Sequence, residues 1–436
     1  MLKDKTICVL GAGRSGQAAA ALALRLGARA RLVDQNPNAT PVDGVECVYG
    51  EVGEGAFAAD TIVVSPGIAA EGDLVSRARA ACADVVGELG FAARFVPEGA
   101  KIAAITGTNG KSTVTAFTAQ LLEAAGLRTF AGGNLGTPLS DAVAGGPEDG
   151  WEVAAVEVSS YQLELPGDFA PSAAAVLNVT PDHLARHKTL EVYARTKCRI
   201  FDRLPPDGVA AIPAGEPLLA RLAADRPGRR CELGGLPGVL VRGDTATLED
   251  GEVDLSGMTV PGAINRWNAG VACLLARGLG APLEALDPSV LRGLPHRMEA
   301  VVTSAGVQWV NDSKATNVEA TLAALAGLAR PAVVLLGGFP KPGSRYQTLM
   351  DPLKARARAV VCFGEAGPRI AESVRGAAPV HEAFNLNEAC ELAASLARPG
   401  DMVLLSPACS SFDAFRNFEH RGEVFRELAI ARTVES

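Results

Sequence analysis

The sequence lacks several features that mark particular classes of protein. Its 436 residues contain no apolar stretch that approaches the roughly 18–20 residues needed to span a membrane. There is no run of five or more lysine and arginine residues, and the net charge is -8, which argues against a nucleic-acid-binding protein. The nine cysteines are scattered without CxxC spacing, which argues against a disulfide scaffold and a cysteine-based zinc site.

The first residues also lack the parts of a signal peptide. Residues 1–5 (MLKDK) run directly into an apolar strand, without a separate apolar segment or a small-residue cleavage site. We therefore expect no leader, and we expect the cysteines to remain reduced, as they are in the cytoplasm.

The sequence does contain a strand followed by a glycine-bearing loop, and this unit occurs at residues 6–16, 101–113 and 332–341. Hydrophobic residues make up 48% and charged residues 21% of the chain, which excludes a disordered protein. Strands that alternate with helical stretches predict parallel sheets with helices on both faces, the α/β class.

The length predicts about three domains of roughly 150 residues each. Proline and glycine punctuate the chain near residues 95–99 and 294–297, so we place the domains at 1–96, 97–297 and 298–436. The segment 205–265 has short strand-like runs, and we interpret it as an edge extension of the central domain.

The first loop has the pattern G-x-G-x-x-G, with Gly11, Gly13 and Gly16 directly after a predicted strand at Thr6–Leu10. Asp34 ends the next strand, where it could bind a ribose hydroxyl. Such a loop lets the backbone approach a diphosphate at a helix N-terminus. Taken alone it fits an NAD-dependent dehydrogenase, and it also fits a tight turn without a ligand.

The second loop, residues 107–113 (GTNGKST), is similar to a phosphate-binding loop, although Ile105 stands where the first glycine would be. Its backbone N–H groups can surround phosphates, and Lys111 can reach the β- and γ-phosphates. Ser112 or Thr113 can bind Mg²⁺.

Further polar residues follow the strands predicted at residues 151–157 and 173–177. Glu157 and His183 stand at the carboxyl ends of these strands, where α/β sheets bind ligands. Judged on the residue alone, His183 would be an ordinary loop histidine and Lys197, in a helix predicted around residues 193–204, a solvated surface lysine.

Taken together, these motifs resemble the ATP-dependent Mur ligases of peptidoglycan synthesis. The resemblance covers essentially the whole chain and rests first on GTNGKST, Glu157-x-Ser159-Ser160-x-Gln162, Asn178-Val179-x-x-Asp182-His183 and Tyr193-x-x-x-Lys197. Residues 311–317 (NDSKATN), 406–413 (SPACSSFD) and 417–422 (NFEHRG) are similar to those of the D-glutamate-adding members.

The resemblance implies a Rossmann-like N-terminal domain for a UDP-sugar, a central P-loop ATPase-like domain and a Rossmann-like C-terminal domain for an amino acid. It implies ATP-dependent ligation of D-glutamate to UDP-N-acetylmuramoyl-L-alanine through an acyl phosphate. ATP and two Mg²⁺ ions would be the cofactors, and these small molecules the only partners. We expect a cytoplasmic monomer that binds no nucleic acid and spans no membrane.

The resemblance also implies roles for individual residues. The catalytic positions are Lys111, Glu157, His183 and Lys197, the last as a carbamate. The metal ligands are Ser112, Glu157, His183 and carbamylated Lys197. The ATP-binding positions are Gly107, Thr108, Asn109, Gly110, Lys111, Ser112, Thr113, Asn268, Arg297, Asp312 and Lys314. The UDP-sugar positions are Arg14, Ser15, Gly16, Asp34, Ser65, Pro66, Gly67 and Asn134. The D-glutamate positions are Thr316, Lys341, Ser411 and Phe418.

Three alternatives stay open at this point. A dehydrogenase would use only the first loop and leaves the second unexplained. A nucleotide-dependent switch would use the phosphate loop without turnover. Another amide ligase, such as a folylpolyglutamate synthase, shares the central loop but is not expected to carry the loop at residues 11–16.

Overall fold

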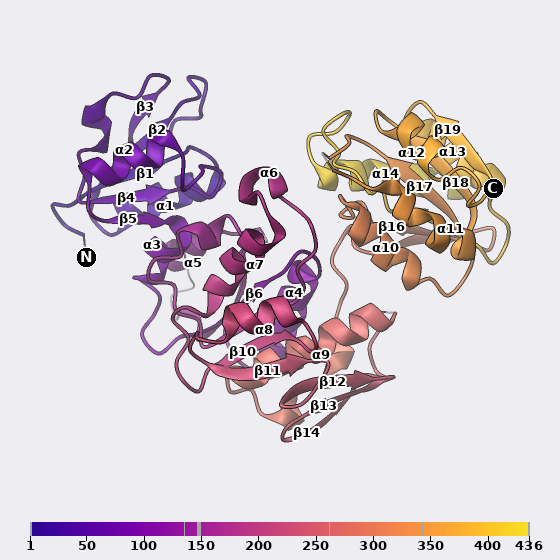
Figure 1. The fold of residues 1–436 in the computed structure, drawn as a ribbon, viewed down its shortest axis with the longest axis horizontal. Helices are drawn as coiled ribbons and strands as arrows, with labels where there is room; N and C mark the ends of the chain where they lie inside the picture. The colour runs from indigo at the N-terminus through magenta and orange to yellow at the C-terminus, as the bar shows by residue number, and fades with distance from the viewer. Residues whose placement is uncertain (1, 135, 146–149, 261, 342, 435–436) are drawn as a thin grey trace. The chain divides into compact units, whose positions relative to one another are not determined.

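The structure is a computed structural model that describes residues 2–134, 136–145, 150–260, 262–341 and 343–434. Within these residues the strands form three sheets, flanked by helices, which confirms the predicted α/β class (Figure 1). The chain divides into two compact units, which are residues 1–259 with 265–291, and residues 260–264 with 292–436. The domain boundaries proposed from the sequence stay predictions.

The first sheet is parallel and has the strand order β3-β2-β1-β4-β5. The predicted strand at Thr6–Leu10 is confirmed as β1. The other strands are β2 (Arg29–Asp34), β3 (Glu46–Tyr49), β4 (Thr61–Val64) and β5 (Val85–Gly87). The helices are α1 (Arg14–Arg25), η1 (Glu54–Phe57), α2 (Asp73–Ala81) and α3 (Glu88–Ala93).

The central sheet has the order β14-β13-β12-β11-β10-β9-β6-β8-β7. Its strands are β6 (Lys101–Thr106), β7 (Thr129–Gly133), β8 (Val153–Glu157), β9 (Ala173–Val176), β10 (Val209–Pro213), β11 (Arg229–Leu233), β12 (Gly238–Arg242), β13 (Thr245–Leu248) and β14 (Gly251–Asp254). The strands from the segment 205–265 therefore extend one edge of this sheet, as the sequence predicted.

The helices of the central part are α4 (Lys111–Ala124), α5 (Leu139–Gly145), η2 (Gln162–Glu164), α6 (Leu184–His187), α7 (Leu190–Cys198), η3 (Arg199–Phe201), α8 (Pro217–Ala223), α9 (Ala263–Gly278), η4 (Leu283–Ala285) and η5 (Pro288–Val290). Two predictions need adjustment. The helix expected around residues 193–204 begins earlier and ends at Cys198, where a short 3-10 turn follows. Lys111, which we expected in the loop, is the first residue of α4.

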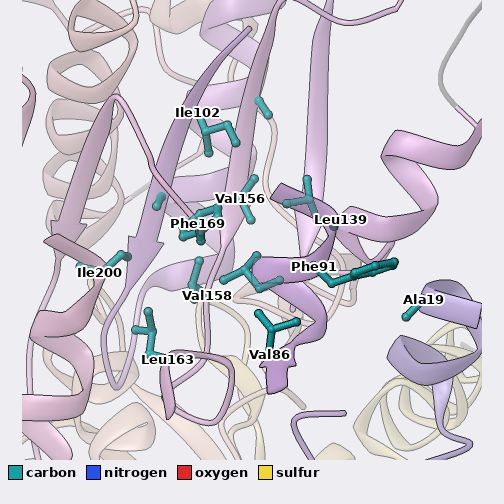
Figure 2. Close-up of a cluster of buried hydrophobic side chains, with 14 of the residues drawn as sticks. Ala19, Val86, Phe91, Ile102, Leu139, Val156, Val158, Leu163, Phe169 and Ile200 are labelled. Carbon is teal, nitrogen blue, oxygen red and sulfur yellow. The ribbon is translucent and has the colours of Figure 1, made fainter. Parts of the chain in front are cut away.

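An apolar cluster of the first unit runs from the N-terminal sheet into the central sheet. Phe91 of α3 and Leu139 of α5 lie in this cluster with Ile102 of β6 and Val156 of β8 (Figure 2). All four are at least 96% buried, with exposures of 1%, 0%, 4% and 0% respectively. Burial on both faces explains why these strands are almost continuously apolar, the pattern of parallel sheets.

The second unit contains a sheet with the order β15-β16-β20-β17-β18-β19, in which only the β15–β16 pair is antiparallel among the described strands. Its strands are β15 (Glu299–Ser304), β16 (Val307–Asn311), β17 (Ala332–Gly337), β18 (Ala357–Phe363), β19 (Val380–Ala383) and β20 (Met402–Leu405). Its helices are α10 (Val318–Ala326), η6 (Tyr346–Leu349), α11 (Met350–Arg356), α12 (Gly367–Ser373), α13 (Leu386–Leu396) and α14 (Phe418–Val434).

Two expectations based on absent features can be compared with the structure. All nine cysteines are free, and eight of them are buried. Among the described residues, no helix is both long enough and apolar enough to cross a membrane.

Phe117 provides a test of the packing beneath the central sheet. Its side chain is completely buried on α4, so Phe117→Ala should lower the free energy of unfolding by about 3–5 kcal/mol. Glu123→Ala changes an exposed residue of the same helix and should stay within about 0.5 kcal/mol. Urea unfolding followed by circular dichroism measures both, and equal effects would contradict this packing.

Candidate functional site

The phosphate loop takes its shape from two glycines between β6 and α4. Gly107 and Gly110 have φ angles of 156° and 85°, a region that residues with side chains rarely adopt. A Cβ atom at Gly107 would also lie 3.0 Å from the Cβ atom of Leu177. The loop can therefore follow the end of the neighbouring strand closely, and its backbone turns into the start of α4.

Asn178 and Thr180, which follow β9, hold this loop. The backbone N–H of Asn109 donates to Oδ1 of Asn178 at 2.9 Å, and Nδ2 of Asn178 donates back to the carbonyl of Asn109 at 3.0 Å. The N–H of Thr180 donates to the hydroxyl of Thr108 at 3.0 Å. These reciprocal bonds fix the shape of the loop.

Asn268 comes from the far end of the central part of the sequence, on α9, and the structure brings it to the same loop. Its Oδ1 lies 3.4 Å from where a Cβ atom of Gly110 would be. This oxygen is buried and has no hydrogen-bond partner in the described structure. Asn268 therefore lies beside the phosphate loop, and its contact with ATP stays a prediction.

Two lysines converge on one carbonyl of the loop. The carbonyl oxygen of Gly107 accepts from Nζ of Lys111 at 2.9 Å and from Nζ of Lys197 at 2.9 Å. Lys197 is 1% exposed. Burial lowers the pKa of Lys197 well below its ordinary value of 10.5, and the charge of Lys111 lowers that pKa further. The environment therefore favours a neutral amine at Lys197, unlike the surface lysine that the residue alone suggested.

A buried carboxylate lies in the same place. Glu157 is the last residue of β8 and is 2% exposed, and its Oε1 accepts from Nδ2 of Asn134 at 2.7 Å. The negative charges of Asp182 and Glu157 partly oppose the lowering of the Lys197 pKa. Asn134, predicted to bind the UDP-sugar, thus contacts a predicted metal ligand.

His183 lies on the segment after β9, with a left-handed φ of 54° as the residue that precedes α6. Its Nδ1 is 3.0 Å from the hydroxyl of Tyr161, and its backbone N–H donates to Asp182 at 2.9 Å. A partner at Nδ1 orients the ring, as outer-shell groups orient histidines that bind metals.

Only two of the predicted metal ligands, Glu157 and His183, have a carboxylate or imidazole side chain. Among the described residues, no group of three or more His, Cys, Asp and Glu side chains is arranged to hold a metal ion. Mg²⁺ typically binds one or two carboxylates together with substrate phosphates. The residues present fit this ion, because a neutral buried amine at Lys197 is the form from which a carbamate ligand can be made.

The first glycine loop is compact and is held by Asp34. A Cβ atom at Gly16 would lie 1.8 Å from the carbonyl oxygen of Gly11, so only glycine fits there. Ser65 donates to that same carbonyl at 2.9 Å, and Asp34 accepts from the N–H of Ala12 at 2.6 Å. Asp34, which was predicted to bind a ribose hydroxyl, therefore also shapes the loop.

The remaining predicted UDP-sugar positions lie around this loop. Arg14 and Ser15 begin α1, whereas Pro66 and Gly67 directly follow Ser65 after β4. Asn134 follows β7 in the central part instead. These placements leave the UDP-sugar roles as predictions.

In the second unit, a buried arginine joins the loops after β16 and β20. Arg421 is 0% exposed on α14, and burial lowers its pKa to about 10. Its guanidinium donates to the carbonyls of Ser313 at 2.8 Å, Ser410 at 3.0 Å and Cys409 at 3.1 Å. These bonds set the backbone beside Ser411.

The predicted residues of this unit gather around those loops. Nζ of Lys314 lies 3.9 Å from the ring centroid of Phe418, and Ser411 is 2% exposed. The N–H of Phe339 donates to the carbonyl of Ser410 at 2.9 Å, which brings in the loop that carries Lys341. The N–H of Thr316 donates to the carbonyl of Lys314 at 2.8 Å.

Asp312 also lies in this unit, at the end of β16. It accepts from the Ser406 hydroxyl at 2.8 Å and from the N–H of Met298 at 3.3 Å. Burial raises the pKa of Asp312 from 3.8 to about 7, while the hydrogen bond from Ser406 and the charge of Arg297 lower it partly. Arg297 therefore lies near enough to Asp312 for their charges to interact.

Sequence reasoning assigned no role to Asn178, Tyr161 or Arg421, which hold the loops and the ring of His183. All three stand inside the quoted motifs. Their presence in a motif was the available signal, but a motif does not say which residue contacts a ligand and which supports one that does.

The comparisons with known proteins agree with this architecture. Residues 5–87 match the family profile "Mur ligase MurD-like, N-terminal domain", residues 105–234 match "Mur ligase middle domain", and residues 296–409 match "Mur ligase, glutamate ligase domain". Three domains, a phosphate loop and a buried lysine beside it thus define an ATP-dependent ligase of this type, and the chain belongs to the Mur ligase family.

Curated relatives match along nearly the whole chain. A protein of Anaeromyxobacter dehalogenans named UDP-N-acetylmuramoylalanine--D-glutamate ligase is 40% identical and covers 98% of each chain. The protein of the same name from Desulfotalea psychrophila is 38% identical over 98% of this chain and 96% of its own.

Solved structures share the fold at low identity. MurF of Thermotoga maritima, in complex with ADP, has a TM-score of 0.63 at 19% identity and covers 99% of this chain and 96% of its own. MurC of the same organism has a TM-score of 0.60 at 17% identity, with 98% and 100% covered. These likenesses confirm the fold that the resemblance implied.

The pKa of Asp312 predicts a pH dependence of stability. A raised folded-state pKa stabilises the protein below the unfolded value of 3.8, and this contribution is lost as pH rises through about 7. Asp312→Asn removes the titration, so the melting temperature of the variant minus that of the wild type should be more positive at pH 8 than at pH 5. Scanning calorimetry at both pH values measures it.

Asp351→Asn, at an exposed position of the same unit, is the control and should give nearly the same difference at both pH values. A difference for Asp312→Asn that does not change with pH would contradict the burial of an ionisable carboxyl.

Proposed function

We propose that the chain joins D-glutamate to UDP-N-acetylmuramoyl-L-alanine, driven by ATP, in peptidoglycan precursor synthesis. Relatives named for this ligase match 98% of the chain at 38–40% identity. The observation that carries the proposal is the site in which one carbonyl binds Lys111 and buried Lys197 close to Glu157. The MurD-like profile over residues 5–87 favours this reaction over that of a folylpolyglutamate synthase.

The alanyl carboxylate of the substrate is a poor electrophile and has to be activated. A terminal oxygen of the alanyl carboxylate attacks the γ-phosphorus of ATP, and ADP leaves to give an acyl phosphate. The nitrogen of D-glutamate then attacks the acyl carbon, and the tetrahedral intermediate expels phosphate. The nitrogen loses a proton, and the amide bond is formed. Because the carboxylate and ATP are both anionic, neutralising charge governs the barrier.

Residues of the first unit supply this neutralisation in our proposal. Lys111 carries a positive charge at the start of α4, where it and the backbone N–H groups at the N-terminus of that helix would face the phosphates. Ser112, Glu157, His183 and Lys197, as a carbamate, would hold two Mg²⁺ ions. Bound Mg²⁺ would screen the negative charge of the phosphates and favour transfer of the γ-phosphoryl group.

The other substrates are assigned to different parts of the chain. The loop at residues 11–16 and the segment at residues 65–67 would bind the uridine diphosphate, with Asp34 on the uridine side. In the second unit, Lys341 would pair with a carboxylate of D-glutamate, and Thr316, Ser411 and Phe418 would complete the pocket. Asn268, Arg297, Asp312 and Lys314 would contact ATP or support its binding.

We further propose that the protein works as a cytoplasmic monomer on these small molecules. Its nine free cysteines support a reducing compartment.

Release of ADP with UDP-N-acetylmuramoyl-L-alanine tests the function directly. ADP should be released over many turnovers only when an amino acid is added, and D-glutamate should be used far better than L-glutamate, D-alanine or meso-diaminopimelate. Reduction of NAD, or preference for another of these amino acids, would overturn the proposal.

Gly13 tests the assignment of the first loop. A Cβ atom at Gly13 would meet no atom within 4 Å, and the residue has an ordinary φ of −71°. Gly13→Val should therefore keep the melting temperature and weaken UDP binding at least tenfold, because its side chain would occupy ligand space, while ATP binding is unchanged. Calorimetric titration with each nucleotide measures this.

The matched control is Gly53→Val, since Gly53 also has open space around it and an ordinary φ of −76°. It should bind UDP like the wild type. Unchanged UDP binding in Gly13→Val would remove this loop from the proposed site.

Lys197 tests the carbamate. Lys197→Arg keeps a cation but cannot form the same carbamate, so activity should fall by orders of magnitude, and Lys197→Ala should be partly rescued by acetate or formate. Lys354→Arg, at an exposed position, should stay fully active. Labelled bicarbonate should give a carbamate signal by NMR in the wild type and none in Lys197→Arg, and normal turnover of Lys197→Arg would refute the role.

A further inference from the structure

A partly buried ion pair joins two segments of the first unit that the proposed reaction does not yet connect. Nε of Arg186 donates to Oε1 of Glu164 at 2.8 Å, and its Nη2 donates to Oε2 at 2.6 Å. The two side chains are 17% and 15% exposed. This bidentate geometry fixes the orientation of the guanidinium as well as its distance from the carboxylate.

The same two side chains hold the segment that follows β4. Arg186 donates to the carbonyl of Gly67 at 3.2 Å and to that of Ile68 at 2.8 Å. Glu164 accepts from the N–H of Ala70 at 3.2 Å. The segment that includes the expected UDP-sugar residue Gly67 is thus bound to side chains of the central part.

Arg186 also connects to the expected metal ligand. Its guanidinium carbon lies 4.7 Å from the ring centroid of Tyr161, within cation–π range. The hydroxyl of that tyrosine is 3.0 Å from Nδ1 of His183. A small cavity beside these groups is lined by Pro66, Tyr161 and Glu164. A continuous set of contacts therefore runs from the segment after β4 to His183.

General cohesion between the two sheets does not require this pair. The apolar cluster that contains Phe91 and Leu139 already joins them (Figure 2). Arg94 also connects this boundary, since it donates to Asp168 at 2.9 Å and to Asp84 at 2.7 Å. What distinguishes the Glu164–Arg186 pair is that it contacts the backbone of the segment expected to bind the nucleotide sugar.

We propose that Glu164 and Arg186 are positioning residues that hold the UDP-sugar segment at a set distance and orientation from His183. The inference rests on the proposed function, in which one end of the substrate is bound near Gly67 and its carboxylate reacts beside the phosphate loop. A misplacement of about 1 Å between a reacting group and its site can cost about 100-fold in rate. A rigid pair at this point limits such misplacement.

Arg186→Lys is the main test, because lysine keeps the positive charge but cannot form the bidentate pair with Glu164. We expect the KM for UDP-N-acetylmuramoyl-L-alanine to rise about tenfold or more and kcat to fall, since charge-assisted bonds to the segment are lost. The KM for ATP and the melting temperature should stay close to those of the wild type. Glu164→Gln should act in the same direction, and the double variant should be no worse than the stronger single one.

Arg94→Lys is the matched control, because it alters an arginine at the same boundary that does not contact residues 66–70. It should leave both KM values unchanged. Calorimetric titration of each variant with UDP adds a readout that does not depend on turnover, and we expect weaker binding only in the Arg186 and Glu164 variants.

The inference is overturned if Arg186→Lys keeps the wild-type KM, kcat and UDP affinity. It is also overturned if ATP affinity and melting temperature fall together with UDP affinity, because that pattern belongs to a general structural role. Failure of the proposed function would look different, since the wild type itself would then release no ADP with D-glutamate.

Discussion

The site of the first unit depends on the carbonyl of Gly107, which accepts hydrogen bonds from Lys111 and Lys197 together. Two ammonium groups on one oxygen would repel each other, and Lys197 has almost no access to water. Burial is the larger cause of the lowered pKa of Lys197 and the charge of Lys111 the smaller one, so the arrangement is stable when Lys197 is neutral. A neutral lysine amine is nucleophilic, which is why an ordinary residue type becomes chemically distinctive here.

The surroundings of that carbonyl are built from ends of neighbouring parallel strands. β6 leads into the phosphate loop, β8 ends at Glu157, and the segment after β9 carries Asn178 and His183. Because these strands are parallel and adjacent, their carboxyl ends meet at one edge of the sheet. The groups that we propose to act in phosphoryl transfer are therefore brought together by the sheet topology, although they are far apart in the sequence.

In the second unit, a buried arginine holds the loops that carry predicted site residues. Arg421 has several carbonyl partners from the loops after β16 and β20, and these bonds offset part of the cost of burying its charge. Both units thus use a cation among carbonyl groups to fix loops. In the first unit the cation lies at the expected phosphate site, whereas in the second it stabilises the backbone beside Ser411.

The sequence by itself determined the strands that run into glycine loops. The apolar run at Thr6–Leu10 and the loop glycines are local signals, because Gly107 has a φ that favours glycine and a side chain at Gly16 would meet the carbonyl of nearby Gly11. The α/β class follows from the same local alternation. Both ends of α7 differ from the prediction, since helix ends carry weak local signals.

Only the tertiary structure showed that Lys197 and Arg186 are covered by protein and which groups they contact. Lys197 is 90 positions from Gly107, and Arg186 is 119 positions from Gly67. In the sequence both are ordinary cations near helices, and nothing in their neighbours shows whether water or protein will cover them. Burial and pairing arise only when distant strands and loops meet, because desolvation and charge interactions depend on distance in space rather than on separation along the chain.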